Sequence, residues 1–210
     1  GHCESARQVG GDFFDVIACG DGQLLLVVAD VMGKGVPAAM FAAILRSLFR
    51  ALPWGDFRPS QLLNQANRLL YEDLSAVDMF ITVQVLHIDA IARRVRVANA
   101  GHCPALLSGQ HGEPARTLAP DGVPLGVLPD AEFSDQEAGL SPGAYTDGLV
   151  ETRNPDGELY GYERLNQWLV TAAAEGLGVQ QLKERLIGEL SRFQESDLLQ
   201  DDQTFLILAG

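Results

Sequence analysis

Two apolar runs lie close to the N-terminus, at residues 12 to 18 and 23 to 30, and the turn Gly20-Asp21-Gly22 separates them. A short glycine-containing turn between apolar runs is typical of a β-hairpin. The pattern therefore predicts that the first two strands of the protein pair with each other. It also places two aspartates, Asp12 and Asp30, on neighbouring strands.

Four other segments carry apolar residues at spacings of three and four, the period of an amphipathic α-helix. They run from 36 to 52, 60 to 74, 162 to 174 and 178 to 193. Pro37 near the start of the first segment and Ser60 at the N-cap position of the second are typical of helix starts. The pattern predicts two helix pairs, one after the hairpin and one near the C-terminus.

The segments between the helices are rich in β-branched and apolar residues. They cover 79 to 88, 92 to 99 and 103 to 108, then 122 to 127, 132 to 140, a short piece before Asp147, and 204 to 208. The first three predict an antiparallel meander. Helix pairs between runs of antiparallel strands predict an α+β layered sandwich, and 210 residues suffice for one domain spanning 1 to 210.

The acidic charge balance of the chain indicates which kinds of partner it does not bind. The chain has 28 acidic and 15 basic residues, a formal net charge of −13, and its lysines are Lys34 and Lys183 alone. This balance argues against a nucleic-acid partner. The apolar stretches are shorter than the roughly 20 residues needed to span a bilayer, so no membrane insertion is expected.

The three cysteines, Cys3, Cys19 and Cys103, are odd in number and have no metal-ligand spacing. They predict reduced thiols in a cytoplasmic protein. Gly1-His2 is typical of an expression-tag remnant. Because a motif follows almost at once, we expect the chain to be the C-terminal part of a longer regulatory protein.

Four aspartate signatures lie far apart in the chain, at 9 to 15, 29 to 35, 145 to 148 and 201 to 204. An aspartate at the end of an apolar run can be aimed by a rigid strand, and a neighbouring glycine allows close approach. Several converging carboxylates repel one another unless a cation neutralises them. Oxygen ligands without a His or Cys cluster favour Mg²⁺ or Mn²⁺ over Zn²⁺. The signatures therefore predict a metal-dependent hydrolase.

The order of seven short motifs resembles the SpoIIE/RsbU-type branch of the metal-dependent PPM serine/threonine protein phosphatases. The matching stretches are VGGDFFD at 9 to 15, ADVMGKGVPAA at 29 to 39, FITV at 80 to 83, ANAGHCPALL at 98 to 107, GVPLGV at 122 to 127, YTDGLVETRN at 145 to 154 and DDQTFL at 201 to 206. One such string arises by chance, whereas seven in the same order are specific. The resemblance implies a four-layer α-β-β-α sandwich, with two stacked antiparallel sheets flanked by helix pairs and two divalent cations, Mn²⁺ or Mg²⁺, at one end.

The resemblance also implies roles for individual residues. Asp30 would bridge both metals, and the backbone carbonyl of Val31 would bind one of them. Asp147 and Asp201 would complete the protein ligands of the other metal. Two cations roughly 3.5 to 4 Å apart activate a shared water for in-line attack on a phosphoryl group, so no side-chain nucleophile is required.

Five further residues are expected to have roles other than direct metal binding. Asp12 would hold a metal through water, Asp202 would be an auxiliary ligand, and Asp15 is more typical of a structural or outer-shell residue. Arg7 has the offset of a phosphate-binding arginine, since a guanidinium can hold two phosphoryl oxygens; a surface arginine is the alternative. His102 fits the Asn-Ala-Gly-His turn of the family and is expected to be a structural hydrogen-bonding residue.

The sequence departs from the family pattern in two places. Met32 stands where eukaryotic relatives carry a histidine that protonates the leaving alkoxide, which leaves the general acid unassigned. Between Gly143 and Tyr145 there is one residue, where relatives have an acidic residue and three or four apolar residues of a central strand. Either residues are missing from this segment, or an altered loop displaces Asp147.

Two functions from different classes follow. The first is a phosphatase that hydrolyses phosphoserine or phosphothreonine of a protein in bacterial signalling and sigma-factor regulation, with a phosphorylated anti-sigma-factor antagonist as the substrate that the resemblance implies. The alternative is a pseudophosphatase that acts as a partner-binding adaptor without turnover. The aspartates favour the enzyme, because a pure binding module has no need for clustered carboxylates. The resemblance also implies an upstream sensor or receiver domain, and a homodimer is compatible with the sequence.

Overall fold

A five-stranded antiparallel sheet lies at the centre of the structure, a computed structural model that describes residues 1–4, 10–51, 58–107, 115–139, 144–145, 149–195 and 202–208. In spatial order its strands are β2 (Phe13–Gly20), β3 (Gln23–Val31), β4 (Ile81–Asp89), β5 (Arg94–Ala100) and β8 (Gln136–Gly139). β2 and β3 form the predicted hairpin, with Phe13 opposite Ala29. β3 and β4 are buried on both faces, which explains their almost continuous apolar sequence.

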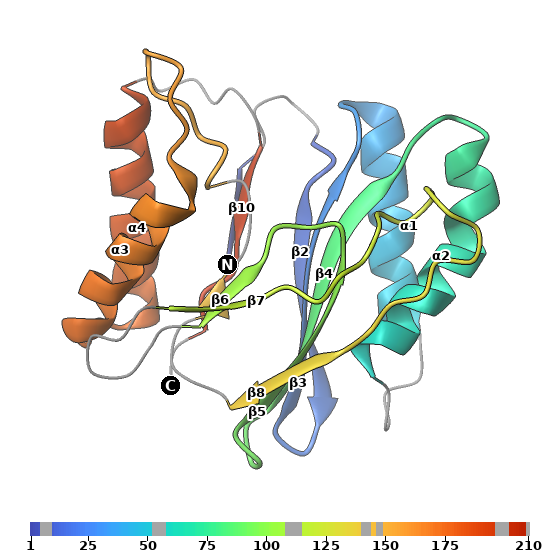
Figure 1. Ribbon diagram of the computed structural model, residues 1–210, viewed down its shortest axis with the longest axis horizontal. Helices are drawn as coiled ribbons and strands as arrows, with labels where there is room; N and C mark the ends of the chain where they lie inside the picture. The colour runs from blue at the N-terminus through green and yellow to red at the C-terminus, as the bar shows by residue number, and fades with distance from the viewer. Residues whose placement is uncertain are drawn as a thin grey trace.

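Two helices cover one face of this sheet, α1 (Val36–Ala51) and α2 (Pro59–Ser75) (Figure 1). Alternate strand residues such as Val27 and Val83 point toward the helices, where they join one apolar core with Leu45 and Leu63. Each of these four side chains is fully buried. The amphipathic pattern of the first helix pair thus predicted both helices. In α1, however, the apolar positions Met40 and Ile44 are 59% and 45% exposed, and the buried face is that of Ala42 and Leu45.

The opposite face of the sheet packs against a second β layer. Within the described residues this layer consists of one three-stranded sheet, β7-β6-β9, and one two-stranded sheet, β1-β10. The bounds are β1 (His2–Glu4), β6 (Ala105–Leu107), β7 (Arg116–Leu118), β9 (Ala144–Tyr145) and β10 (Gln203–Phe205). Leu107 and Leu206 face the central sheet, where they join Val28 and Leu86 in the core between the layers.

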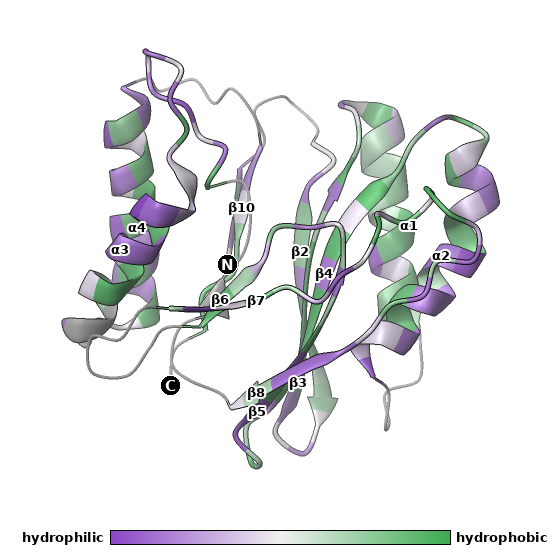
Figure 2. Cartoon of the chain, in the orientation of Figure 1, coloured by the Kyte–Doolittle hydropathy of each residue, from purple (hydrophilic) through white to green (hydrophobic). Residues whose placement is uncertain are grey.

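The second helix pair, α3 (Gly161–Ala174) and α4 (Val179–Gln194), covers the outer side of the second β layer. Leu106 and Phe205 point toward these helices and join Leu165 and Leu186 in a third core. Figure 2 shows polar residues concentrated on the outward side of α3 and α4. Three cores separate four layers, so the predicted α+β, α-β-β-α sandwich is confirmed.

Three strand predictions need correction. The segment predicted at 103 to 108 forms β6, which belongs to the second layer instead of continuing the meander of β4 and β5, because a tight turn at Gly101, φ +68°, redirects the chain. The segment 122 to 127 is not a strand: Leu125 alone pairs there, with Ile81. Pro124 has no N–H to donate to a ladder, and Gly126 has a φ of +89°. The strand predicted at 132 to 140 is reduced to β8.

Neither disulfides nor membrane helices contribute to the described part of the chain. Cys3, Cys19 and Cys103 are thiols that form no disulfide bond, as predicted. No helix among the described residues combines the length and the apolar character that crossing a bilayer requires. The fold is therefore held by its three apolar cores and the hydrogen bonds of its sheets.

Candidate active site

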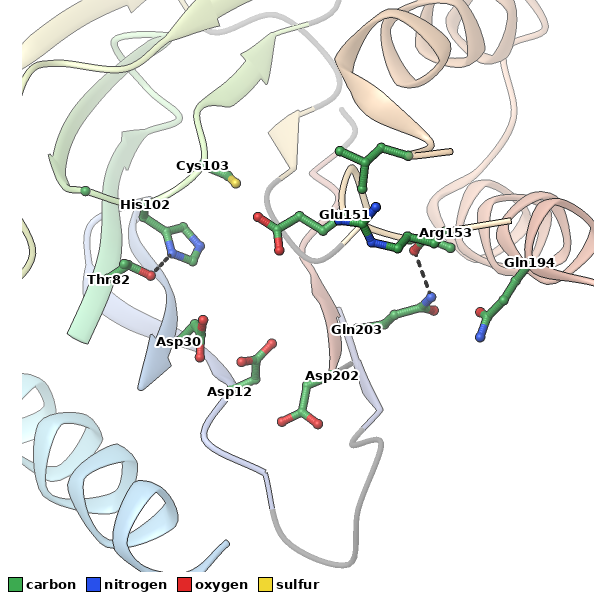
Figure 3. A pocket seen from close by; sticks show the side chains of 13 residues that line it. Asp12, Asp30, Thr82, His102, Cys103, Glu151, Arg153, Gln194, Asp202 and Gln203 are labelled. Carbon is green, nitrogen blue, oxygen red and sulfur yellow. Dashed lines mark hydrogen bonds between the residues drawn. The ribbon is translucent and has the colours of Figure 1, made fainter. Parts of the chain in front are cut away.

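A pocket of about 520 Å³ is lined by residues of both β layers (Figure 3). Asp30, near the end of β3, and Thr82, near the start of β4, come from the central sheet. Asp202 comes from the second layer, directly before β10, and Asp12 lies directly before β2. In Figure 3 the three aspartates face the same space. The fold thus brings together three of the predicted metal-site carboxylates.

The strand register explains how Asp30 reaches the pocket. Asp30 pairs with Thr82 across β3 and β4, so both side chains lie on the face that points toward the second layer. The preceding residues of β3, Leu25 to Ala29, are buried on both sides of the sheet. A buried strand cannot shift its register without moving its apolar side chains into solvent. The carboxylate of Asp30 is therefore presented by a rigid support.

A hydrogen-bonded turn places His102 on the wall of the pocket. Asn99 Nδ2 donates to the His102 carbonyl at 2.8 Å, and the His102 N–H donates to Asn99 Oδ1 at 2.7 Å. His102 Nδ1 in turn lies 2.8 Å from Thr82 Oγ1. His102 therefore has the hydrogen-bonding role expected of it, and it fixes the Thr82 side chain beside Asp30.

Cys3 of the N-terminal strand β1 lies between two of the aspartate segments, next to Asp12 and next to the strand that follows Asp202. Cys3 lies on β1, pairs with Thr204 of β10, and accepts a hydrogen bond from the Thr204 hydroxyl at 3.3 Å. Its thiol lies 3.7 Å from the carbonyl oxygen of Asp12. Burial and the negative charges of Asp12 and Asp202 raise the pKa of the Cys3 thiol, against the hydrogen bond from Thr204. Both carboxylates therefore act on one small region beside the pocket.

The donors around the pocket fit a hard divalent cation. Asp12, Asp30 and Asp202 offer carboxylate oxygens, the ligand type that Mg²⁺ and Mn²⁺ prefer. A Cβ atom added at Gly11 would lie 2.7 Å from the carbonyl oxygen of Val31, so only glycine allows the chain this close to that oxygen. Within the described residues, no three His, Cys, Asp or Glu side chains form a metal site by themselves.

The other predicted site residues lie elsewhere. Arg7, Asp147 and Asp201 fall outside the described residues, so their predicted roles remain predictions. Asp15 does not line the pocket. It is buried on β2 and forms a bidentate ion pair with Arg50 of α1, whose Nε and Nη2 lie 2.5 and 2.6 Å from the two carboxylate oxygens.

The ion pairs of Asp15 connect β2 to α1, and Asp15→Asn tests their contribution to stability. Burial alone would raise the Asp15 pKa, but the Arg50 hydrogen bond and the charges of Arg46 and Arg50 outweigh it and lower the pKa. Because both arginines are about half exposed, we expect Asp15→Asn to lower the free energy of unfolding by only about 1–2 kcal/mol at pH 7.

The pH dependence of this difference follows from the lowered pKa. A carboxyl with a lowered folded pKa contributes its full stability above the unfolded pKa, about 3.9, and loses it as the pH falls through the folded value. Urea unfolding should therefore show wild type and Asp15→Asn converging below about pH 4. A difference that stays constant between pH 7 and pH 3 would contradict the ion-pair explanation.

The pocket also contains residues to which the sequence analysis gave no role. In Figure 3 the Glu151 carboxylate points into the pocket, and Arg153, Gln194 and Gln203 line the wall opposite Asp30. Gln203 Nε2 donates to the buried hydroxyl of Thr152 at 3.0 Å, which connects β10 to the segment before α3. Four of these five residues belong to the motifs YTDGLVETRN and DDQTFL, and that membership was the available signal.

Known structures share this architecture. The SiaA-PP2C domain of Pseudomonas aeruginosa superposes with a TM-score of 0.83 at 23% identity, over 100% of this chain and 84% of that chain. The RsbU and RsbW domains of Rv1364c from Mycobacterium tuberculosis give a TM-score of 0.72 at 26% identity, over 97% of this chain and 56% of that chain. The PP2C phosphatase domain of SpoIIE from Bacillus subtilis gives 0.76 at 16% identity, over 99% of this chain and 62% of that chain. The fold is that of the PPM phosphatase domains.

Sequence comparisons lead to the same group of proteins. Protein IcfG of Synechocystis is 31% identical over 89% of this chain, and phosphoserine phosphatase RsbU of Bacillus subtilis is 27% identical over 97% of it. The chain covers 34% of the first relative and 60% of the second, so it spans less than two thirds of either. The family model "Stage II sporulation protein E (SpoIIE)" matches residues 20–209. The chain belongs to the SpoIIE family.

Proposed function

We propose that this domain is a divalent-metal-dependent phosphatase that hydrolyses phosphoserine or phosphothreonine monoesters in a protein. The observation that carries the proposal is the convergence of Asp12, Asp30 and Asp202 on one pocket from both β layers. The relative RsbU, named a phosphoserine phosphatase, aligns with 97% of the chain and so supports the reaction class. The fold similarity to RsbX, solved in complex with magnesium, supports Mg²⁺ or Mn²⁺ as the cofactor.

The candidate metal-site residues have different proposed roles. Asp30 and the Val31 carbonyl would hold metal directly, together with Asp147 and Asp201, while Asp12 would hold a metal through water and Asp202 would be an auxiliary ligand. Bound divalent cations supply a water of lowered pKa and electrostatic stabilisation of the phosphoryl oxygens. Because no cysteine or serine nucleophile is needed, the task of the protein is to position its carboxylates and the substrate.

Both walls of the pocket hold polar groups in fixed positions. The Thr82 and His102 side chains contact each other at 2.8 Å, and those of Gln203 and Thr152 at 3.0 Å. Hydrogen-bonded pairs of this kind keep their rotamers when substrate enters, which lowers the cost of reorganisation. Arg7 remains the proposed phosphate-binding group.

We further propose that the natural substrate is a phosphorylated anti-sigma-factor antagonist and that a sensor or receiver domain upstream controls the activity. The coverage of the relatives supports a larger protein, because this chain accounts for 60% of RsbU and 50% of the phosphoserine phosphatase RsbP of Bacillus subtilis.

A partner-binding pseudophosphatase is the second candidate, and two observations favour it. Met32, 40% exposed after β3, occupies the position of the general acid of eukaryotic relatives. The sequence has one residue between Gly143 and Tyr145, where relatives have most of a central strand, and the described part of this segment, β9, pairs Ala144 and Tyr145 with Leu107 and Leu106 of β6.

Phosphate release by the purified protein decides between the two candidates. The protein is incubated with a phosphoserine peptide and, separately, with an aryl phosphate, in Mn²⁺, in Mg²⁺ or in excess EDTA. A phosphatase releases phosphate from both substrates with metal, and the activity disappears in EDTA and returns when Mn²⁺ is restored. Equal rates with and without metal would contradict the two-metal proposal. No turnover under any condition, with retained phosphopeptide binding, would establish the adaptor.

A further inference from the structure

A second groove lies next to the candidate active site. It has a volume of about 860 Å³ and is lined by the start of α3, by the residues just before it and by α4. Leu159, which is 44% exposed, lines both this groove and the pocket of the aspartates. Helix α4 also serves both: Gln194 at its end lines the pocket, while Arg192 and Glu189 line the groove. The two cavities are therefore neighbours, with Leu159 between them.

The ridge between the cavities is held rigidly. Arg153 on the pocket side pairs with Leu159 in an antiparallel bridge, and its Nη1 donates to the Gly157 carbonyl at 2.9 Å. Arg164 on the groove side donates to the Leu159 carbonyl at 2.7 Å and lies over the ring of Phe193, 5.0 Å from its centre. A chain that crosses this ridge would therefore meet a surface that is already formed, with little ordering cost.

The groove offers the residue types that dominate protein recognition. Trp168 and Tyr162 supply aromatic surface beside Leu159, and tryptophan, tyrosine and arginine are enriched where interfaces gain most of their affinity. Burial raises the pKa of Tyr160 to about 12, so this groove residue keeps its proton at neutral pH.

Arginine is concentrated in the groove, in contrast to the acidic balance of the whole chain. The formal net charge of the chain is −13, yet three arginines, Arg164, Arg185 and Arg192, line the groove together with two glutamates, Glu163 and Glu189. Arg185 is paired with Glu175, and Arg164 is engaged with the ridge. Arg192 is 73% exposed, and its contacts within the described residues are to Glu189 and the Gly188 carbonyl, which leaves Nη1 as a donor.

We propose that this groove binds the segment of the phosphoprotein substrate that flanks the phosphorylated residue, and that Arg192 selects substrates with acidic side chains in that segment. The proposal rests on the proposed phosphatase function, because the phosphoserine is taken to occupy the neighbouring pocket. An acidic flank would otherwise be repelled by the negative charge of the protein and of the pocket. Arg192 provides a local position where such a side chain gains a charge-assisted hydrogen bond.

Steady-state kinetics of Arg192 variants test the proposal. Two phosphoserine peptides are compared, one with aspartates on both flanks and one with asparagines in their place. Wild type should have a KM about fivefold lower for the aspartate peptide, the size expected for an exposed charge pair. Arg192→Gln should abolish this preference, and Arg192→Glu should reverse it. Hydrolysis of an aryl phosphate, which has no flank, should stay unchanged in both variants.

Arg116→Gln is the matched control, because Arg116 is exposed on β7 and lines neither cavity. It should retain the preference of wild type. The groove proposal is overturned if Arg192→Gln keeps the preference, or if Arg116→Gln loses it to the same extent. If no protein hydrolyses the aryl phosphate, the proposed function fails. Fluorescence anisotropy of the labelled peptides with wild type and Arg192→Gln then decides whether the groove binds an acidic flank.

Discussion

Asp30→Asn is expected to lower metal-dependent hydrolysis of an aryl phosphate at least about a thousandfold. Asparagine keeps the size of the side chain but removes the negative charge that the proposed bridging position requires. Metal catalysis contributes several kcal/mol of transition-state stabilisation, and each 1.4 kcal/mol is a factor of ten in rate. Because Asp30 is exposed at the end of a buried strand, the substitution leaves the three apolar cores intact.

Asp73→Asn provides the control, since Asp73 is exposed on α2 and does not line the pocket. It should retain the activity of wild type. Circular dichroism and urea unfolding should show that both variants are folded, and isothermal titration with Mn²⁺ should show weakened binding in Asp30→Asn alone. An Asp30→Asn protein that binds Mn²⁺ and hydrolyses the aryl phosphate like wild type would refute the metal role of Asp30.

Asn99→Ala is expected to destabilise the protein by roughly 2–4 kcal/mol and to reduce its activity. The Asn99 side chain, 4% exposed, makes two hydrogen bonds to the backbone of His102, at 2.8 and 2.7 Å. Alanine would leave a buried N–H and a buried carbonyl unsatisfied, each at a cost of about 1–3 kcal/mol. The turn that brings His102 to Thr82 would loosen, and with it one wall of the pocket.

Asn99→Asp removes one of the two hydrogen bonds and keeps the other. An aspartate can still accept from the His102 N–H, but when ionised it has no donor for the His102 carbonyl. We expect urea unfolding of this variant to show a smaller loss of stability near neutral pH than Asn99→Ala, because the His102 N–H keeps its acceptor. Thr82→Val then isolates the pocket wall, because it removes only the contact with His102 Nδ1. An Asn99→Ala protein as stable as wild type would contradict the importance of this turn.

Much of the architecture could be predicted from local pattern. The hairpin of β2 and β3 followed from two apolar runs and the turn Gly20-Asp21-Gly22, and all four helices followed from apolar spacings of three and four. These features depend on residues close together in the chain. The second β layer was predicted less well, because β1 and β10 are three residues long and pair across almost the whole chain. Such short strands carry no period that can be recognised.

Some residues of the candidate site could also be predicted from the sequence, whereas others could not. Motif order singled out Asp12, Asp30 and Asp202, and the structure places all three on one pocket. Glu151 and Arg153 belong to a recognised motif, but nothing in their local sequence distinguishes a pocket residue from one on an exposed turn. Asp15 shows the opposite case: it lies in the motif VGGDFFD, yet its partner is Arg50, 35 residues away on α1.

The sequence by itself determined the family, the four helices and the hairpin, because all of these are encoded in spacing, turn residues and motif order. Only the tertiary structure decided which residues share the pocket, that β6 belongs to the second β layer, and that Leu159 lies between the pocket and the groove of Arg192. The physical reason is that these relations arise where separate strands and helices pack against each other. Packing of this kind follows from the combined burial of many distant residues and leaves no mark in any one segment.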